Sequence, residues 1–380
     1  MKQLKHLAAV ALFTFSGFTT FAQGEKNNWY FGKGAGMIFS GDTAQATSSR
    51  LFTEEGSAVW SDKDGNLVLY TNGITVWNRD HKVMPNGNGL MGGKSSTQSA
   101  LILPKPGSDN IYYIFTTDIQ AQSDGLRYSI VDMNKDNGKG DLVYKNNFII
   151  APATEKLTAV KHSNGRDWWV LAHRWNSNGY MAFLINDEGV TTQPVMSMVG
   201  TVHGGPNRKA IGYLVPSPDG TRLAAALWND DSNFEILKFD RSTGKVSDPI
   251  LLKGFSEAYG VAFSPDGSKL YGTTYGKEDG KGQVVQFDLT AGNQDAIAKS
   301  AVVVGVSGSP KVGALQLGPD GRIYMARKDN YYLGVIHNPN QKGTASNYVD
   351  NGFHLGKQKS DLGLPNFPHL PAFSRTSTYK

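Results

Sequence analysis

The stretch NGNGLMGGKSSTQS, residues 86–99, has the residue types of a phosphate-binding loop. A Walker A loop needs a glycine, four further residues and then Gly-Lys-Ser/Thr, and Gly93-Lys94-Ser95 supplies the end of that pattern. The first glycine is missing because Asn88 stands in its place. The apolar run after Gln98 also predicts a strand where the motif requires a helix. The sequence therefore predicts no nucleotide site at this loop.

A second stretch, residues 132–141, has the spacing found at the start of a calcium loop. Asp132, Asn134 and Asp136 fall at the first, third and fifth positions, where oxygen ligands belong. The glycine of the sixth position and the acidic residue of the twelfth are both missing. We predict a calcium candidate at these three residues, with a plain polar turn as the alternative.

The sequence lacks the other local motifs that signal catalysis or a cofactor. It has no cysteine, which excludes disulfides and thiolate zinc sites. Its histidines show no HExxH spacing, and residues 305–309, GVSGS, lack the last glycine of a nucleophile elbow. We therefore predict no catalytic residue from a motif and no cofactor besides the calcium candidate. An active site assembled from distant parts of the chain stays open.

Aromatic and basic side chains are the remaining candidates for contact with a ligand. Trp175 and Trp228 fall where predicted strands run into polar loops, and Arg174 precedes the first of them. Aromatic and arginine side chains in combination suit a glycan, peptide or protein surface. Unrelated surface residues are the alternative interpretation. The predicted ligand-binding residues are Lys94, Ser95, Ser96, Thr97, His173, Arg174, Trp175, Trp228 and Arg327.

An internal repeat predicts the scaffold that positions these residues. Six copies of an apolar strand, a turn with Gly or Asn, and an apolar-aromatic strand recur 45 to 55 residues apart. Two further strands follow most copies, and four short strands per repeat of this length are typical of a propeller blade. In such a fold the predicted residues near positions 174, 228 and 327 share a rim with residues 94–97. The turn centres are Asp64, Asp109, Asn164, Asp219, Asp266 and Asp320.

The two ends of the chain predict one more blade. Residues 27–53 contain three strands without an innermost partner, and LPNFPHLPAF, residues 364–373, contains one strand without a hairpin. Together they make a seventh blade that closes the ring and removes free sheet edges. We predict an all-β, seven-bladed propeller of four-stranded antiparallel blades, with six and eight blades as the alternatives.

The first 22 residues have the features of a signal peptide. Lys2 and Lys5 precede an apolar stretch, and Ala22 ends a small-residue cleavage site. We predict a signal peptide at 1–22, a single propeller domain at 23–380, and an exported protein of the periplasm or cell surface. No later segment is apolar enough to span a membrane. The formal charge of +5 is spread among interleaved acids and bases, so no nucleic-acid partner is predicted.

Several motifs, in order, resemble those of a known family. NNWYFGKGAGMIF, then ITVWNRDH with the SSTQSALI block, and finally LGLPNF are similar to the N-terminal β-propeller of large Bacteroidota cell-surface proteins. Those proteins continue into PKD-type modules and a gliding-motility-associated sorting domain for type IX secretion. The resemblance implies a WD-like propeller and an exported location, and it implies no reaction. Such modules do not follow before Lys380, so we consider a truncated copy, a periplasmic protein and a partner-held surface subunit.

We expect a non-catalytic module that binds an envelope or surface protein or a glycan, as a monomer or a subunit of a larger complex. The alternative is a hydrolase or lyase whose site lies at the central channel, which requires ionisable groups that converge from several blades. A third alternative is an inert spacer. Fold alone does not decide among these classes.

Overall fold

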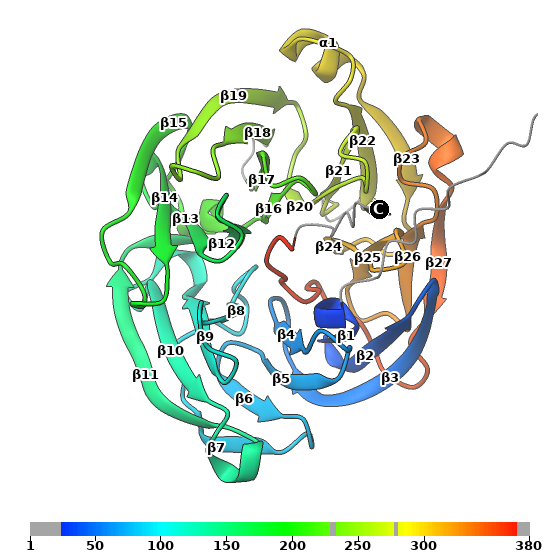
Figure 1. The fold of residues 1–380 in the computed structure, drawn as a ribbon. Coiled ribbons are helices and arrows are strands. Elements are labelled where there is room, and N and C mark those ends of the chain that lie inside the picture. The colour runs from blue at the N-terminus through cyan, green and yellow to red at the C-terminus, as the bar shows by residue number, and fades with distance from the viewer. Residues whose placement is uncertain (1–23, 229–232, 277–279, 371–380) are drawn as a thin grey trace, which may run out of the picture.

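A computed structural model of the chain describes residues 24–228, 233–276 and 280–370. The predicted signal peptide and the last ten residues lie outside the described residues. Within them, 27 strands form seven antiparallel sheets arranged as a ring, so the predicted seven-bladed propeller is confirmed (Figure 1).

Six blades have four strands each, paired in sequence order from the channel outward. Each begins with one of the six predicted hairpins. Blade 1 holds β4 (Ala58–Ser61), β5 (Leu67–Thr71), β6 (Thr75–Asn78) and β7 (Val83–Asn88); blade 2 holds β8 (Ala100–Pro104), β9 (Ile111–Thr117), β10 (Leu126–Asp132) and β11 (Asp141–Ile150); blade 3 holds β12 (Ala153–Lys161), β13 (Trp168–Arg174), β14 (Ser177–Ile185) and β15 (Val195–His203). Blade 4 holds β16 (Leu214–Pro216), β17 (Arg222–Leu227), β18 (Asn233–Phe239) and β19 (Val246–Lys253); blade 5 holds β20 (Ala258–Phe263), β21 (Lys269–Thr274), β22 (Gln283–Asp288) and β23 (Val302–Val306); blade 6 holds β24 (Val312–Leu317), β25 (Ile323–Arg327), β26 (Tyr332–Ile336) and β27 (Tyr348–His354).

The hairpin turns are stabilised by their own side chains. In the turn between β20 and β21, Asp266 accepts hydrogen bonds from the Ser264 hydroxyl at 2.6 Å and from the Ser268 amide at 2.9 Å. Gly267 follows with a φ of +68°, a conformation that glycine adopts without a Cβ clash. The turn between β16 and β17 repeats this arrangement around Asp219. The Ser-Pro-Asp-Gly sequence therefore encodes the same turn twice.

Blade 7 contains β1 (Asn28–Phe31), β2 (Lys33–Ser40) and β3 (Thr43–Phe52) from the start of the chain. Residues 359–370, which we call the closing segment, lie on the channel side of this sheet (Figure 1). The closing segment makes isolated bridges rather than a regular strand, with Lys359 paired to Lys33 and Gly34. Both ends of the chain thus complete one blade, as predicted.

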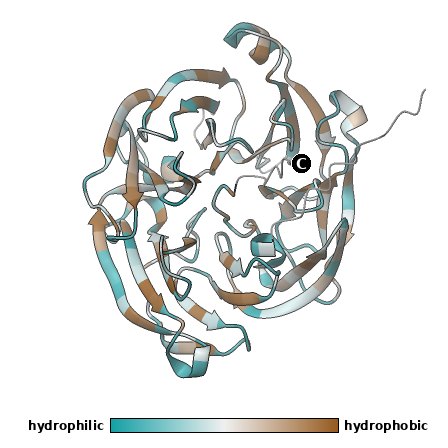
Figure 2. Cartoon of the chain, viewed as in Figure 1, coloured by the Kyte–Doolittle hydropathy of each residue, from teal (hydrophilic) through white to brown (hydrophobic). Residues whose placement is uncertain are grey.

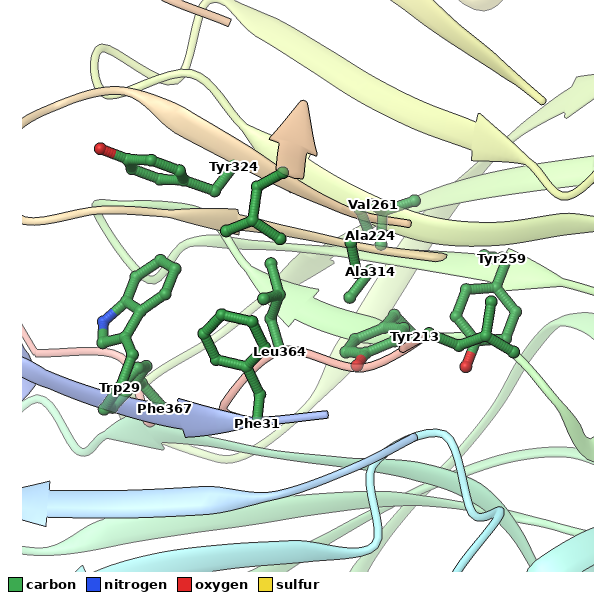
Figure 3. Close-up of a cluster of buried hydrophobic side chains, with 14 of the residues drawn as sticks. Trp29, Phe31, Tyr213, Ala224, Tyr259, Val261, Ala314, Tyr324, Leu364 and Phe367 are labelled. Carbon is green, nitrogen blue, oxygen red and sulfur yellow. The ribbon is translucent and has the colours of Figure 1, made fainter. Parts of the chain in front are cut away.

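The closing segment also fills the centre of the ring. The Leu362 amide donates to Glu54 O at 2.9 Å, and farther along the His369 amide donates to Ala159 O at 2.7 Å. Figure 3 shows Leu364 and Phe367 packed among Trp29 and other buried aromatic side chains. The channel is therefore plugged by apolar side chains.

The two faces of the ring follow from the strand order. One face carries the links between blades and the loops between second and third strands; we call it the link face. The opposite face carries the turns between first and second strands, and we call it the hairpin face. The first strand of each blade starts at the link face and lines the channel. The residues just before the first strands therefore surround the link-face end of the channel, which we call the mouth.

Apolar residues recur in the strands of every blade, whereas polar residues concentrate in the loops (Figure 2). Inner strands such as β4 and β20 are buried throughout. Outer strands face solvent on one side, with Tyr144 of β11 exposed by 64%. Among the described residues, α1 (Gln294–Lys299) is a single short α-helix, and no helix there is both long and apolar enough to cross a membrane.

Candidate functional site

The glycine-rich loop of residues 86–99 ends at the mouth, where it holds two acidic side chains. The Ser95 hydroxyl donates to Glu55 Oε1 at 3.4 Å. The Thr97 amide and hydroxyl donate to Glu155 Oε2 at 2.8 Å and 2.5 Å. This loop links blades 1 and 2, Glu55 lies in the link before β4, and Glu155 lies in β12. The loop therefore positions carboxylates from two other parts of the ring.

Both carboxylates are buried, Glu55 with 5% and Glu155 with 0% of its surface exposed. Burial, reinforced by the charge of Glu155, raises the pKa of Glu55 well above its usual value. Burial also raises the pKa of Glu155, although hydrogen bonds from Thr97 and the Gln120 amide oppose that change. Desolvation disfavours the charged form of an acid, so this pair tends to hold protons at a pH where exposed glutamates are ionised.

Lys156 follows Glu155 and is fully buried. Its Nζ donates to Ile211 O at 3.0 Å. Burial lowers the pKa of Lys156 to about 7, and the nearby charges of Glu155 and Glu235 oppose that effect. The mouth thus contains a lysine that loses its proton near neutral pH.

Two buried tyrosines face these acids. Tyr213 precedes β16 and Tyr259 lies in β20, with ring centroids 5.7 Å apart. The Tyr259 hydroxyl interacts with the Glu55 carboxylate, and the Tyr213 hydroxyl interacts with the backbone at Leu364. Burial raises the pKa of Tyr259 well above its usual value, and the charge of Glu55 adds to the effect. Figure 3 shows the Tyr213 ring next to Leu364 of the closing segment, and the Tyr259 ring on the other side of Tyr213.

A cluster of aromatic and basic side chains surrounds this buried group toward solvent. The Trp228 ring lies 6.0 Å from that of Tyr259 and 5.0 Å from that of half-buried Tyr275, edge to face in both cases. Exposed Arg208 and Lys311 each lie 5.7 Å from the centroid of a ring, Arg208 over Trp228 and Lys311 over Tyr275. We call Arg208, Trp228, Tyr275 and Lys311 the rim cluster. Cations over aromatic faces are stabilised by the ring quadrupole.

A second buried polar group lies between blades 3 and 4. The rings of His173 and His203 stack at a centroid distance of 3.6 Å, and both residues are buried. Burial, together with the charge of Lys156, lowers the pKa of His173 to about 3, and burial lowers that of His203 as well. Parallel stacked rings direct their nitrogens in parallel, so the pair cannot converge on one metal ion.

The structure brings part of the predicted ligand-binding set together. Ser95, Ser96 and Thr97 lie at the mouth, and Trp228 lies in the rim cluster. Trp175 packs close by, against Ala121 and Ala210, the last residues of the 3-10 helices η2 (Ile119–Ala121) and η4 (Asn207–Ala210). Lys94 and Arg174 are exposed, whereas Ser96, Thr97, His173, Trp175, Trp228 and Arg327 are buried. Most of the predicted ligand-binding residues are therefore buried, and do not form the exposed rim that the sequence predicted.

Arg327 lies apart from the mouth and connects two strands within blade 6. Its guanidinium contacts Asp350 Oδ2 at 2.9 Å and Asn351 Oδ1 at 2.6 Å, which ties β25 to the outer strand β27.

In the calcium candidate, the amide and side-chain nitrogens of Asn134 both donate to Asp132 Oδ1 at 2.9 Å. This contact is typical of a polar turn.

The described residues also form an open cavity of about 310 Å³ on the hairpin face. It lies between blades 1 and 2 and is lined by polar turn residues, among them Asp62, Arg79 and Asp109. It carries no buried cluster of ionisable groups comparable to that of the mouth.

Sequence reasoning missed five residues of the mouth and three of the rim cluster: Glu55, Glu155, Lys156, Tyr213 and Tyr259, and Arg208, Tyr275 and Lys311. The five mouth residues lie just before, or within, the first strand of a blade. A polar or tyrosine residue at that position of each repeat was the signal available in the sequence.

Comparison with known proteins supports the fold. No protein-family model and no curated protein matches the chain. A candidate 6-phosphogluconolactonase from Bacteroides uniformis is similar in structure, with a TM-score of 0.51, 12% identity, and coverage of 87% of this chain and 98% of that chain. The Dos1 propeller gives a TM-score of 0.49 at 9% identity, covering 89% of this chain and 86% of that one. At such low identities the likeness concerns the fold alone.

Proposed function

We propose that this protein is an exported, non-catalytic β-propeller of the cell envelope or cell surface that binds a protein or glycan through its link face. Export rests on the predicted signal peptide and on the resemblance of the motifs to N-terminal propellers of Bacteroidota surface proteins. The rim cluster is the observation that carries the binding role.

The rim cluster has the composition of a binding surface. Two aromatic rings lie edge to face, and two exposed cations cover them. Aromatic and arginine side chains dominate the binding energy of many protein interfaces, and aromatic rings also stack on sugar faces. Rings already fixed by packing lose little entropy when a ligand binds.

The buried state of the mouth favours binding over catalysis. Glu55, Glu155 and Lys156 converge from two parts of the ring with shifted pKa values, which is the pattern expected of the hydrolase or lyase alternative. All three have at most 5% of their surface exposed, and the closing segment plugs the channel beneath them. A substrate has no access to these groups in this conformation.

The test is affinity capture of envelope proteins and polysaccharides on immobilised residues 23–380. The variant Arg208→Glu/Lys311→Glu reverses both rim cations, and Lys63→Glu/Lys105→Glu makes the same charge change in hairpin-face turns. We expect the rim variant to bind at least about tenfold more weakly, because two interface contacts are lost, and the hairpin-face variant to bind normally. Equal binding by both variants would assign the interaction to another surface.

The catalytic alternative has its own test. Release of product from glycoside, ester or polyuronate substrates by the wild-type chain, abolished in Glu155→Gln, would replace the binding proposal with an enzymatic one.

A further inference from the structure

The sequence contains seven Asn-Gly pairs, at which an asparagine side chain can react with the backbone nitrogen of the next residue. The asparagines are Asn72, Asn86, Asn88, Asn137, Asn164, Asn178 and Asn351. Asparagine is a thermolabile residue, and glycine, which has no Cβ, lets its nitrogen approach the preceding side chain. The reaction also needs a glycine amide that is unbonded and has room to move, so the folded structure decides which pair reacts.

Four of the seven glycine amides already donate hydrogen bonds. Each donates to an oxygen atom two or three residues earlier, at 2.9 to 3.0 Å: Gly73, Gly138, Gly165 and Gly179. A donating amide has to give up that bond before it can attack a side chain, which slows the reaction. The fold therefore protects these four pairs.

Two further pairs are held within strands. Gly87 of β7 is buried, and a Cβ there would meet Met84 O at 2.6 Å. Gly352 lies in β27, and the side-chain oxygen of Asn351 accepts a hydrogen bond from the Arg327 guanidinium at 2.6 Å. Packing and the strand backbone keep both glycines in place.

Asn88-Gly89 differs from the other six pairs. Asn88 is the last residue of β7, and both residues of the pair are exposed. Gly89 has a φ of +82°, and a Cβ built on it would meet no atom within 4 Å beyond its chain neighbours. Among the described residues, its amide donates no hydrogen bond. The Gly89 nitrogen is therefore unbonded and sterically open.

The Asn88 carboxamide has a hydrogen-bond donor at its oxygen. Thr75 Oγ1 donates to Asn88 Oδ1 at 3.1 Å, across the pairing of β6 with β7. The carboxamide oxygen gains negative charge when its carbon is attacked, and a donor aimed at that oxygen stabilises the charge. Both the attacking nitrogen and the attacked carbon are thus prepared for reaction at this pair.

We propose that Asn88 is a site of spontaneous deamidation, and that the Thr75 hydroxyl polarises the reacting carboxamide. The Gly89 nitrogen bonds to Asn88 Cγ and releases its proton to solvent, and the Cγ–Nδ2 bond breaks as ammonia leaves. Water then opens the cyclic imide at one of its two carbonyl carbons, which gives aspartate or isoaspartate. The net reaction consumes one water molecule, releases one ammonia and replaces an amide by a carboxylic acid. It does not depend on what the link face binds.

The products alter the start of the link between blades 1 and 2. Lys145 Nζ donates to Asn88 O at 3.0 Å, and Asn146 Nδ2 donates to Gly89 O at 2.9 Å, so both carbonyls are anchored to β11. In the isoaspartate product the main chain runs through the side-chain carbons and is one carbon longer. The former Asn88 carbonyl then becomes a free carboxylate next to Lys145. Deamidation therefore changes both the charge and the anchoring of the loop that continues to the mouth.

The test is peptide mapping by mass spectrometry of folded residues 23–380 kept at pH 8, with the rate of acid formation measured at each of the seven pairs. We expect Asn88 to react at least about tenfold faster than Asn164, whose glycine amide is bonded, because one hydrogen bond changes a rate by about that factor. In urea, where the fold no longer selects among the pairs, the seven rates should converge. Equal rates at Asn88 and Asn164 in the folded protein, or a faster reaction at any other pair, would overturn the proposal.

Two variants test the part played by Thr75. Thr75→Val removes the donor and keeps the shape of the side chain, and it should slow the reaction at Asn88 by about threefold to tenfold. Thr75→Ser keeps the hydroxyl and should react at the rate of the wild type. An unchanged rate in Thr75→Val would overturn the assignment of the Thr75 hydroxyl to this reaction.

Discussion

Glu55 accepts fewer hydrogen bonds than Glu155, the other buried acid at the mouth, and this affects how its ionisation changes the stability of the fold. Its folded-state pKa lies well above that of an unfolded chain because burial and Glu155 both oppose ionisation. A raised acid pKa favours the folded state at low pH, and this contribution is lost as pH rises through the usual glutamate value toward the folded one. Ionised Glu55 therefore costs stability at neutral pH.

Glu55→Gln should therefore stabilise the chain at pH 8. We expect a gain of about 1–2 kcal/mol, since an amide replaces a buried ionised group, and we expect the gain to shrink toward pH 4.5. Urea unfolding at both pH values measures it. A loss of stability at pH 8 would mean that ionised Glu55 is stabilised by its neighbours in the folded protein.

The stacked histidines predict the acid sensitivity of the fold. Below pH 6.5 an unfolded chain protonates both rings, whereas the folded chain does so at His173 only near pH 3. Stability therefore falls as pH drops through that window. His203→Phe, which keeps a ring in the stack, should match the wild type at pH 7.5 and exceed its stability by about 2 kcal/mol at pH 5. The control His354→Phe changes an exposed ring and should leave the pH dependence unaltered; equal slopes in all three proteins would contradict the prediction.

At the scale of elements, the closing segment connects blades that are distant in sequence. Asn366 Nδ2 donates to Ala100 O of blade 2 at 3.1 Å and to Leu157 O of blade 3 at 2.8 Å. The backbone amide of Asn366 donates to Ser57 O at 2.8 Å, next to blade 1. A Cβ at Gly363 would meet Glu55 O at 1.8 Å, so the segment passes directly against the link before β4.

Asn366→Ala should cost about 2–4 kcal/mol, because it leaves two buried carbonyl oxygens without donors. Asn366→Asp should cost more, because a carboxylate would then face those same carbonyls. The denaturant midpoints of the two variants and of the wild type measure which variant loses more stability. If Asn366→Asp left the stability unchanged, the Asn366 side chain would not bridge the blades.

Sequence reasoning predicted the elements well and the site poorly, for a physical reason. Asp-Gly turns such as that at Asp266 are local signals, so hairpins and their repeat could be read directly. Glu55 and Glu155 are remote in sequence and meet only because the ring closes. Ser95 and Thr97 were selected as ligand contacts, yet they hydrogen-bond these acids, and a sequence pattern does not show which partner a hydroxyl finds.

At the scale of the whole molecule, the ring is closed and its channel is filled. The closing segment bonds to or beside blades 1, 2, 3, 6 and 7, so separate unfolding of one blade would expose apolar surface on its neighbours. We expect one calorimetric transition for residues 23–380, with equal calorimetric and van't Hoff enthalpies. Two resolved transitions would mean that the blades unfold in independent groups.

A filled channel leaves the faces of the ring as the surfaces available to a partner. The link face carries the rim cluster and the loops that hold the buried acids in place. The hairpin face carries short turns that are stabilised by their own side chains. A binding role therefore places contacts on the link face, over residues from blades 4 and 5 and the links that precede blades 4 and 6.

Backbone hydrogen exchange with and without the captured protein or glycan tests this central claim most directly. We predict slower exchange in the bound state at η4 and around Tyr275 and Lys311, with no change at the hairpin turn around Asp64. Slower exchange confined to the hairpin turns, with the rim cluster unaffected, would contradict the assignment of binding to the link face.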